Sequence, residues 1–187
     1  MKNKGNAKSL YSKNQILNAL LKIMQQKMFD EITIKEITET AMISRKTFYR
    51  NFDDKIDVLN IEINRVVLFY LQAVDNTTDL SLSNVAYLIF TTMENFRSFI
   101  QLLVKNNLNH LLIDKMFNNI IEVYKVRKKE LFELYGEKIT CQTLLFSFGG
   151  FEKYISYWIM SETPVTTTQL KEDFEQVTCL IADSIKK

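Results

Sequence analysis

The scarcity of helix-breaking residues is the feature that most constrains this chain. Tight turns are built mainly from glycine, proline and short polar side chains, so a fold rich in β-strands needs many of them. The 187 residues include only four glycines and one proline: Gly5, Gly136, Gly149, Gly150 and Pro164. With 47% hydrophobic residues the chain can still bury a core. We therefore predict an all-α fold of about nine long helices.

Charge is distributed unevenly along the chain. Residues 1–55 hold 11 lysines and arginines against six acidic residues, whereas residues 56–187 hold 13 against 16. The small net charge of +2 thus hides a basic first part and a mildly acidic remainder. This asymmetry is typical of a protein that presents one end to phosphates, although a solvated basic tail is the alternative.

Several other functional classes find little support. Cys141 and Cys179 form no CxxC pair, and His110 is the one histidine, so we expect no metal, no cofactor and no disulfide framework. The sequence carries no nucleophile motif or phosphate-binding loop, which argues against an enzyme. It also lacks a leader pattern and any stretch near the ~20 apolar residues of a membrane span. We expect a cytoplasmic protein with no membrane partner.

The first part of the chain shows a helical pattern after a polar start. Residues 1–11 are polar and basic, and we expect them to form a loose arm. A helix is predicted to begin near Ser12, with Gln15 completing a capping box. Apolar residues from Ile16 to Met28 then recur at spacings of three and four, which predicts a face directed to the core.

Two short helices follow, joined by a tight connection. Thr33 and Glu36 form a second capping box, which predicts a short helix with its apolar residues inward. Ser44 is placed to cap the next helix, Arg45 to Asn51. Asp53 is then expected to cap a long helix that runs to about residue 73. Further helices are predicted at 82–96, 98–107, 110–135, 139–161 and 167–186, separated by polar turns, by Tyr135-Gly136 and by the segment SETPVTT.

The helix from Arg45 to Asn51 presents two different faces. At about 100° per residue, Phe48 and Phe52 fall together as an apolar anchor. An opposite arc of roughly 140° holds cationic and hydrogen-bonding side chains. They are Arg45, Lys46, Tyr49 and Arg50. Such a face suits the major groove, where arginine and lysine donate to guanine, while hydroxyls and helix-start amides suit phosphates.

Residues 12–59 contain a T-x-x-x-I segment, a turn, and the pattern S-x-x-T-[FL]-Y-x-x-F-x-x-K-x-x-[LV]. The residues that carry this pattern are Ile16, Leu17, Thr33, Ile37, Ala41, Ser44, Thr47, Phe48, Tyr49, Phe52, Lys55 and Leu59. With these residues, the segment resembles the N-terminal domain of TetR/AcrR-type transcriptional regulators. The resemblance implies a three-helix helix-turn-helix head, joined by a long helix to a helical body that binds an effector and dimerises. We accordingly expect a DNA-binding domain at 1–55 and the body at 56–187.

The resemblance also implies roles for individual residues of the head. Those that match phosphate-contacting positions are Thr33, Ser44, Thr47, Tyr49 and Lys55. Arg45, Lys46 and Arg50 match positions that read bases or line the groove. Many members have glycine where Met42 and Lys46 stand. We therefore expect the turn at Met42 to avoid a positive φ, and Lys46 to add a contact to a base or to a phosphate.

The body carries most of the aromatic residues, which are core residues by default. The resemblance implies a pocket between body helices, and the candidates to line it are Tyr87, Phe90, His110, Phe117, Tyr124, Gln142 and Tyr154. Residues 146–160 resemble a TetR subgroup in which small residues precede an aromatic-tryptophan run. Two adjacent glycines in a helix favour close approach of a partner helix, with a simple kink as the alternative. The candidate dimer residues are Phe146, Gly149, Gly150, Tyr157, Trp158, Phe174 and Ile181.

Two functional hypotheses remain. The first is a TetR-like regulator, most simply a repressor, that binds a palindromic site on double-stranded DNA as a homodimer and responds to a small molecule. The second is an all-α interaction protein or co-activator of the same fold. It would respond to a protein partner or would not bind DNA directly, since some members of the subgroup act as activators or bind a protein partner.

Overall fold

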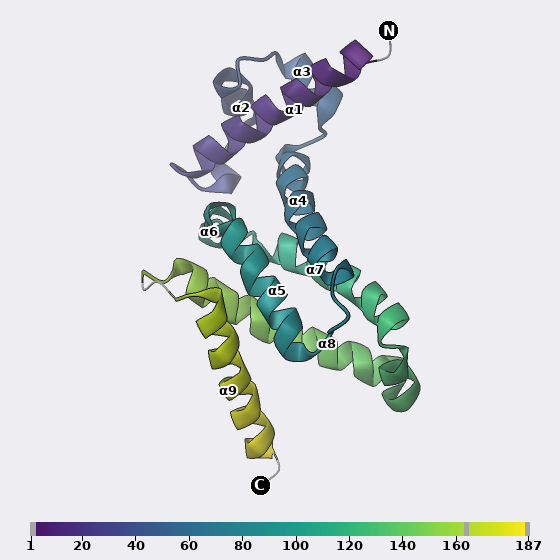
Figure 1. The fold of residues 1–187 in the computed structure, drawn as a ribbon. Coiled ribbons are helices and arrows are strands. Elements are labelled where there is room, and N and C mark those ends of the chain that lie inside the picture. Colours follow the sequence, from purple (N-terminus) through teal and green to yellow (C-terminus); the bar gives the residue numbers. More distant parts are fainter. Residues whose placement is uncertain (1–2, 163–164, 186–187) are drawn as a thin grey trace. The chain divides into compact units, whose positions relative to one another are not determined.

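The computed structural model describes residues 3–162 and 165–185. Within these ranges the chain forms nine α-helices and one short 3-10 helix, with no β-strand, which confirms the all-α prediction (Figure 1). None of the helices in the described ranges is both long and apolar enough to cross a membrane. Residues 1–2 of the expected arm and residues 163–164 of the expected turn lie outside the described residues.

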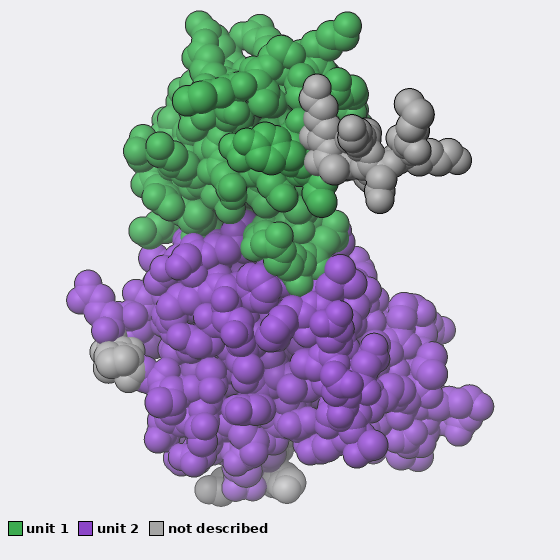
Figure 2. Space-filling model, turned by 45° about the horizontal axis from the view of Figure 1, so that its top comes forward, with its two compact units in different colours: residues 1–65, 102–107 green, residues 66–101, 108–187 purple. Residues whose placement is uncertain are grey.

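The chain divides into two compact units (Figure 2). The first unit comprises residues 1–65 together with 102–107, and the second comprises 66–101 and 108–187. The division therefore falls inside two helices, α4 (Lys55–Asp75) and α6 (Arg97–Lys105).

The first unit is built on α1 (Asn3–Met24), which crosses two short helices (Figure 1). These are α2 (Ile34–Thr40) and α3 (Arg45–Asn51), preceded by the 3-10 helix η1 (Phe29–Glu31). Their apolar faces meet in a core that is closed to solvent. Its fully buried side chains include Ile16, Leu20, Ile37, Phe48 and Leu59.

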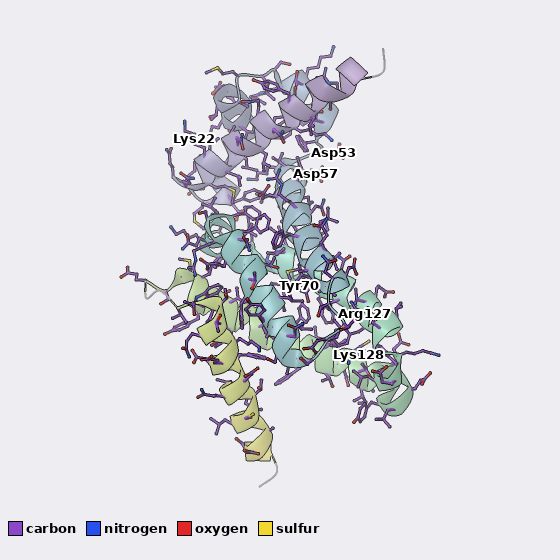
Figure 3. All side chains as sticks on the ribbon, in the orientation of Figure 1. Lys22, Asp53, Asp57, Tyr70, Arg127 and Lys128 are labelled. Carbon is purple, nitrogen blue, oxygen red and sulfur yellow. The ribbon has the colours of Figure 1, made fainter. Side chains whose placement is uncertain are left out.

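Two expectations about helix starts in the first unit are wrong. Helix α1 begins at Asn3, so residues 3–11 are helical rather than a loose arm, and Ser12 lies inside the helix instead of capping it. The segment contains no proline, and one glycine costs a helix only about 1 kcal/mol. Helix α4 is capped by Asp54 and not Asp53, because the Asp54 carboxylate accepts from the Asp57 amide at 2.9 Å. Asp57 in turn accepts from the Asp53 amide at 3.0 Å (Figure 3).

The second unit contains the end of α4, α5 (Leu82–Asn95), the start of α6, α7 (Asn109–Arg127), α8 (Lys129–Met160) and α9 (Thr167–Ile185). Helix α5 packs against α8 and α9, and α7 packs against α8 (Figure 1). The end of α8 is held by side chains of α6, since Arg97 and Gln101 both donate to the Ile159 carbonyl, at 3.1 and 2.9 Å.

The break between the third and fourth body helices was predicted incompletely. A single helix over 110–135 is wrong, because α7 ends at Arg127 (Figure 3). There the Arg127 guanidinium donates to the carbonyls of Val74 and Thr77, and so joins the end of α7 to the end of α4. The expected break at Gly136 is confirmed as a kink inside α8, where Gly136 adopts a φ of 78°.

Candidate nucleic-acid interface

Helix α2 begins with the predicted capping box. The Glu36 amide donates to the Thr33 hydroxyl at 3.2 Å, and the Thr33 amide and hydroxyl both donate to the Glu36 carboxylate at 2.8 Å. Lys27 adds an ion pair of 2.8 Å to the same carboxylate. The hydrogen bond from Lys27, followed by those from Thr33, lowers the pKa of Glu36 from 4.5 to about 2. Thr33 is therefore held at the surface in one orientation.

The turn between α2 and α3 corrects the expectation for Met42. Its φ is +54°, in the left-handed region. The Met42 amide donates to Glu39 O at 3.2 Å, and the Ile43 amide donates to Thr38 O at 3.0 Å. These two bonds form a Schellman motif, which requires a left-handed residue directly after the helix cap. The motif therefore sets the conformation, and methionine adopts it although glycine would do so with less strain.

Helix α3 begins at the predicted cap. The Thr47 amide donates to the Ser44 hydroxyl at 3.1 Å, and the two hydroxyls lie 3.0 Å apart. Ser44 is exposed, and Thr47 is half-buried. Both hydroxyls thus lie at the helix N-terminus, where backbone amides favour an anion.

The two faces of α3 are confirmed. Phe48 is fully buried and Phe52 nearly so, with ring centroids 5.8 Å apart. The opposite side chains, Arg45, Lys46, Tyr49 and Arg50, are all exposed. Tyr49 is 56% exposed, and its ring packs edge-on against Phe48 at 5.5 Å, which fixes the ring and leaves the rest of the side chain accessible. None of the ion pairs among the described side chains involves the three cations.

Lys55 differs from the other candidate contacts. Its Nζ donates to three backbone carbonyls: Phe29 at 2.6 Å, Asp30 at 3.1 Å and Ile32 at 2.9 Å. It also lies 4.5 Å from the centroid of the Phe29 ring, a cation–π distance. Because an ammonium group has three donors, all of them are used inside the protein. The arrangement does not support the phosphate contact expected for this residue.

Sequence reasoning missed one residue of the first unit, Asn106. Its side-chain oxygen accepts from the Phe29 amide at 2.6 Å, and its side-chain nitrogen donates to Leu102 O at 2.8 Å. The side chain is 8% exposed. The sequence gives no signal for this role, because nothing in the polar segment Asn-Asn-Leu-Asn indicates that its first asparagine is buried.

Three of the effector-pocket candidates of the second unit, Phe90, Phe117 and Tyr154, belong to one aromatic cluster linked through Phe148 and Phe151. Phe90 is fully buried and packs against Tyr154, and Phe117 contacts Phe148. Tyr124 is buried, Tyr87 is half-buried, and His110 and Gln142 are exposed. Close to Tyr124, burial raises the pKa of Tyr70, whose hydroxyl has no hydrogen-bond partner among the described atoms (Figure 3).

The dimer candidates separate into two groups. Phe146 and Tyr157 are each 81% exposed, and Ile181 is 50% exposed. The backbone at Gly149 and Gly150 stays helical, and added Cβ atoms there would meet nothing within 4 Å. An apolar groove of about 380 Å³ adjoins this surface, with Phe146, Gly150, Phe174 and Ile181 in its wall.

Trp158 does not belong to that surface. It is 4% exposed, the Arg97 guanidinium lies 4.6 Å from its ring, and it packs edge-on against Phe90. It is therefore a core residue, and its assignment to the dimer face is wrong. Phe174 is intermediate, because it stacks on Phe151 at 4.8 Å while one side still lines the groove.

Two short helices joined by a tight turn, the second with a buried aromatic face and an exposed cationic face, define a DNA-binding helix-turn-helix protein. Residues 16–60 match the family model described as "Bacterial regulatory proteins, tetR family". Residues 16–60 thus form a TetR-family DNA-binding domain, which confirms the resemblance found in this part of the sequence.

A solved structure supports the fold over almost the whole chain. The crystal structure of Lin0861 from Listeria innocua is similar with a TM-score of 0.76 and 19% sequence identity. The similarity covers 94% of this chain and 93% of that one. No curated protein matches the sequence.

Proposed function

We propose that this regulator binds a palindromic operator as a homodimer, most simply as a repressor, with α3 as the recognition helix. The observation that carries the proposal is the exposed face of α3, whose cations lie opposite the buried Phe48. A helix with this division can enter the major groove while its aromatic side stays anchored in the domain.

The exposed side chains divide into two roles. Arg45, Lys46 and Arg50 are proposed to reach base edges or line the groove, since guanidinium and ammonium groups donate to guanine O6 and N7. The hydroxyls proposed to contact phosphates belong to Thr33, Ser44, Thr47 and Tyr49. The capping bonds of Thr33 and Ser44 support this role, because they hold each hydroxyl beside a helix N-terminus.

Dimerisation through α8 and α9 is supported by their apolar exposed residues. Phe146 and Tyr157 lie three helical turns apart on α8 and are the most exposed of them. The open space at Gly149 and Gly150 favours a partner helix there, because none of the described atoms lies within 4 Å of a Cβ added at either glycine. Two heads held about 34–36 Å apart would then meet successive major grooves.

A small-molecule effector is proposed to act through the body, in the cytoplasm where the DNA lies. Tyr70 supports a polar contact there, since its buried hydroxyl lacks a partner among the described atoms. An effector would shift the equilibrium by binding better to a body conformation in which the heads do not match the operator. The alternative occupant of the apolar groove is a protein partner, as in a co-activator.

A salt titration of duplex binding tests the central proposal. Operator-like duplexes selected from a random pool should bind with an affinity that falls steeply with salt. The slope of the logarithm of the binding constant against the logarithm of the salt concentration should be about −0.9 for each phosphate neutralised. The sequence of the selected sites should be palindromic. No affinity for any duplex at low salt would contradict the proposal and leave the interaction protein.

Single substitutions test the division of roles. Arg45→Ala should weaken binding to the selected site by about 10- to 100-fold and reduce base preference, whereas Tyr49→Ala should weaken all duplexes alike. Binding to matched and scrambled duplexes measures both effects. Equal behaviour of the two variants on both duplexes would contradict the assignment.

Sedimentation of the full chain tests the dimer. Phe146→Glu and Tyr157→Glu should shift the chain toward monomers, because each buries a charge in the proposed interface. Leu68→Glu is a matched control, since Leu68 is 58% exposed on α4. A loss of dimers with Leu68→Glu alone would move the interface away from α8.

A further inference from the structure

The turn at residues 29–32, which precedes the helix-turn-helix, is held by two side chains. One binds three of its carbonyls, and the other binds its first amide. Lys55 Nζ donates hydrogen bonds to the carbonyls of Phe29, Asp30 and Ile32, all within 3.1 Å. On the other side, the Phe29 amide donates to the nearly buried Asn106 side chain at 2.6 Å. One ammonium group and one side-chain amide thus bind backbone groups on both sides of this turn, where the Phe29 carbonyl also accepts from the Ile32 amide at 3.0 Å.

The place of Lys55 in the chain gives these bonds a geometric consequence. Ile32 directly precedes Thr33, the cap of α2, and Lys55 is the first residue of α4, shortly after α3 ends. The hydrogen bonds span 23 to 26 residues and enclose both helices of the helix-turn-helix. They close this segment into a loop, which restricts how far α3 can move relative to the turn before α2.

We propose that Lys55 is a positioning residue that closes the helix-turn-helix, and that it does not contact a DNA phosphate. The inference deepens the proposed function and rests on it, because positioning matters to DNA binding only if α3 enters the groove. A phosphate contact would require Lys55 to give up at least one of three short bonds and a ring contact.

Lysine is suited to this task in a way that arginine is not. Three donors on one tetrahedral nitrogen can point at three carbonyls around a single site, whereas a guanidinium spreads its donors in a plane. Arginine would nevertheless keep the charge and bind a phosphate at least as well as lysine. The Lys55→Arg variant therefore separates the two roles.

Duplex binding by full-length variants, measured over a range of salt concentrations, supplies the test. Lys55→Arg and Lys55→Met should both weaken binding by on the order of tenfold and leave the salt slope unchanged, because a positioning bond is lost and no phosphate contact. The control Lys46→Met should reduce the slope by up to about 0.9. Near-normal binding by Lys55→Arg, with a reduced slope in Lys55→Met, would overturn the proposal.

A measurement on the unaltered protein keeps the test decisive if a variant fails to fold. At neutral pH the protons of a solvated lysine ammonium group exchange rapidly with water, and hydrogen bonds that slow this exchange make its ¹H–¹⁵N signal observable. The Lys55 signal should be present in the free protein and unchanged when a selected duplex is added. A signal that appears or shifts only with DNA would overturn the proposal. Failure of the protein to bind any duplex would instead contradict DNA binding, while the signal in the free protein would still test the loop closure.

Discussion

The first and second units organise their polar groups in different ways. In the first, directional bonds fix the backbone at each turn: the Thr33 and Ser44 caps, the Schellman motif at Met42 and the bonds of Lys55. In the second, aromatic rings make the core around Phe90, and two buried hydroxyls lack partners among the described atoms. Directional bonds specify one geometry, whereas apolar packing tolerates rearrangement. The second unit has directional bonds too, at Ile159 and Val74, so the two units differ in where such bonds lie: around every element of the helix-turn-helix in the first unit, and at helix ends outside the aromatic core in the second.

The largest expected effect comes from removing a buried ring in each unit. Phe48→Ala and Phe90→Ala should each cost about 3–5 kcal/mol, because both side chains are fully buried. The chain has one tryptophan, Trp158 in the second unit, so its fluorescence reports the unfolding of that unit. We expect Phe90→Ala to lower strongly the midpoint of unfolding followed by tryptophan fluorescence. Phe48→Ala should lower mainly the midpoint of an unfolding transition followed by circular dichroism. Equal shifts of the tryptophan signal would show that the units unfold together.

A smaller effect is expected at the turn of the head. Met42→Gly should stabilise the first unit by about 1 kcal/mol, because glycine adopts a positive φ without the strain of a side chain. Chemical denaturation followed by circular dichroism measures the change. Met28→Gly is the control, since Met28 has a φ of −66° and glycine there should destabilise. Destabilisation by both variants would show that the Met42 side chain makes a contribution larger than the strain.

In the body, Tyr70→Phe should leave stability unchanged or raise it by up to about 1 kcal/mol, since it removes a buried hydroxyl without a partner. Thermal unfolding followed by Trp158 fluorescence provides the measurement. Tyr124→Phe is the matched control. Because the Tyr124 hydroxyl donates to Leu80 O at 3.5 Å, its removal should lower the stability slightly. A clear loss of stability in Tyr70→Phe would mean that the hydroxyl has a partner, and would weaken the contrast between the units.

The smallest expected effect concerns pH. The pKa of Glu36 is lowered in the folded head from 4.5 to about 2, so its ion pair and capping bonds stabilise the head above pH 4.5. That contribution is lost as the pH falls from 4.5 toward 2. Glu36→Gln should therefore lower the melting temperature at pH 7 but match the unaltered chain near pH 2, whereas Glu39→Gln should change little at either pH. A difference that persists at pH 2 would point to lost packing instead.

The parts of the fold that sequence alone predicted are those set by neighbours in the chain. The caps at Thr33 and Ser44 and the two faces of α3 depend on residues at most four positions apart, so their patterns are visible as local spacing. The family match over 16–60 covers the same segment.

The parts that were missed depend on partners far along the chain. Helix α7 ends where Arg127 reaches carbonyls some 50 residues earlier, and no glycine or proline announces that end. Lys55 was assigned to a phosphate because its charge is visible in the sequence and its carbonyl partners are not. The φ of Met42 was misjudged because the Schellman bonds, rather than the residue type, set it. Trp158 was assigned to a surface because an aromatic pattern in the sequence does not show which of its residues face the core and which face a partner.

The bond between Phe29 and Asn106 has a consequence for the order of assembly during synthesis. The head is nearly complete in sequence when Lys55 leaves the ribosome, yet its compact unit also includes residues 102–107. At ~5–20 residues per second, the intervening stretch of about 50 residues takes on the order of 3–10 s to appear. During that interval the Phe29 amide has no Asn106 to bind, although Lys55 can already close the loop. The hydrogen bond between Phe29 and Asn106, which completes the first unit, can therefore form only when roughly half of the chain has been made.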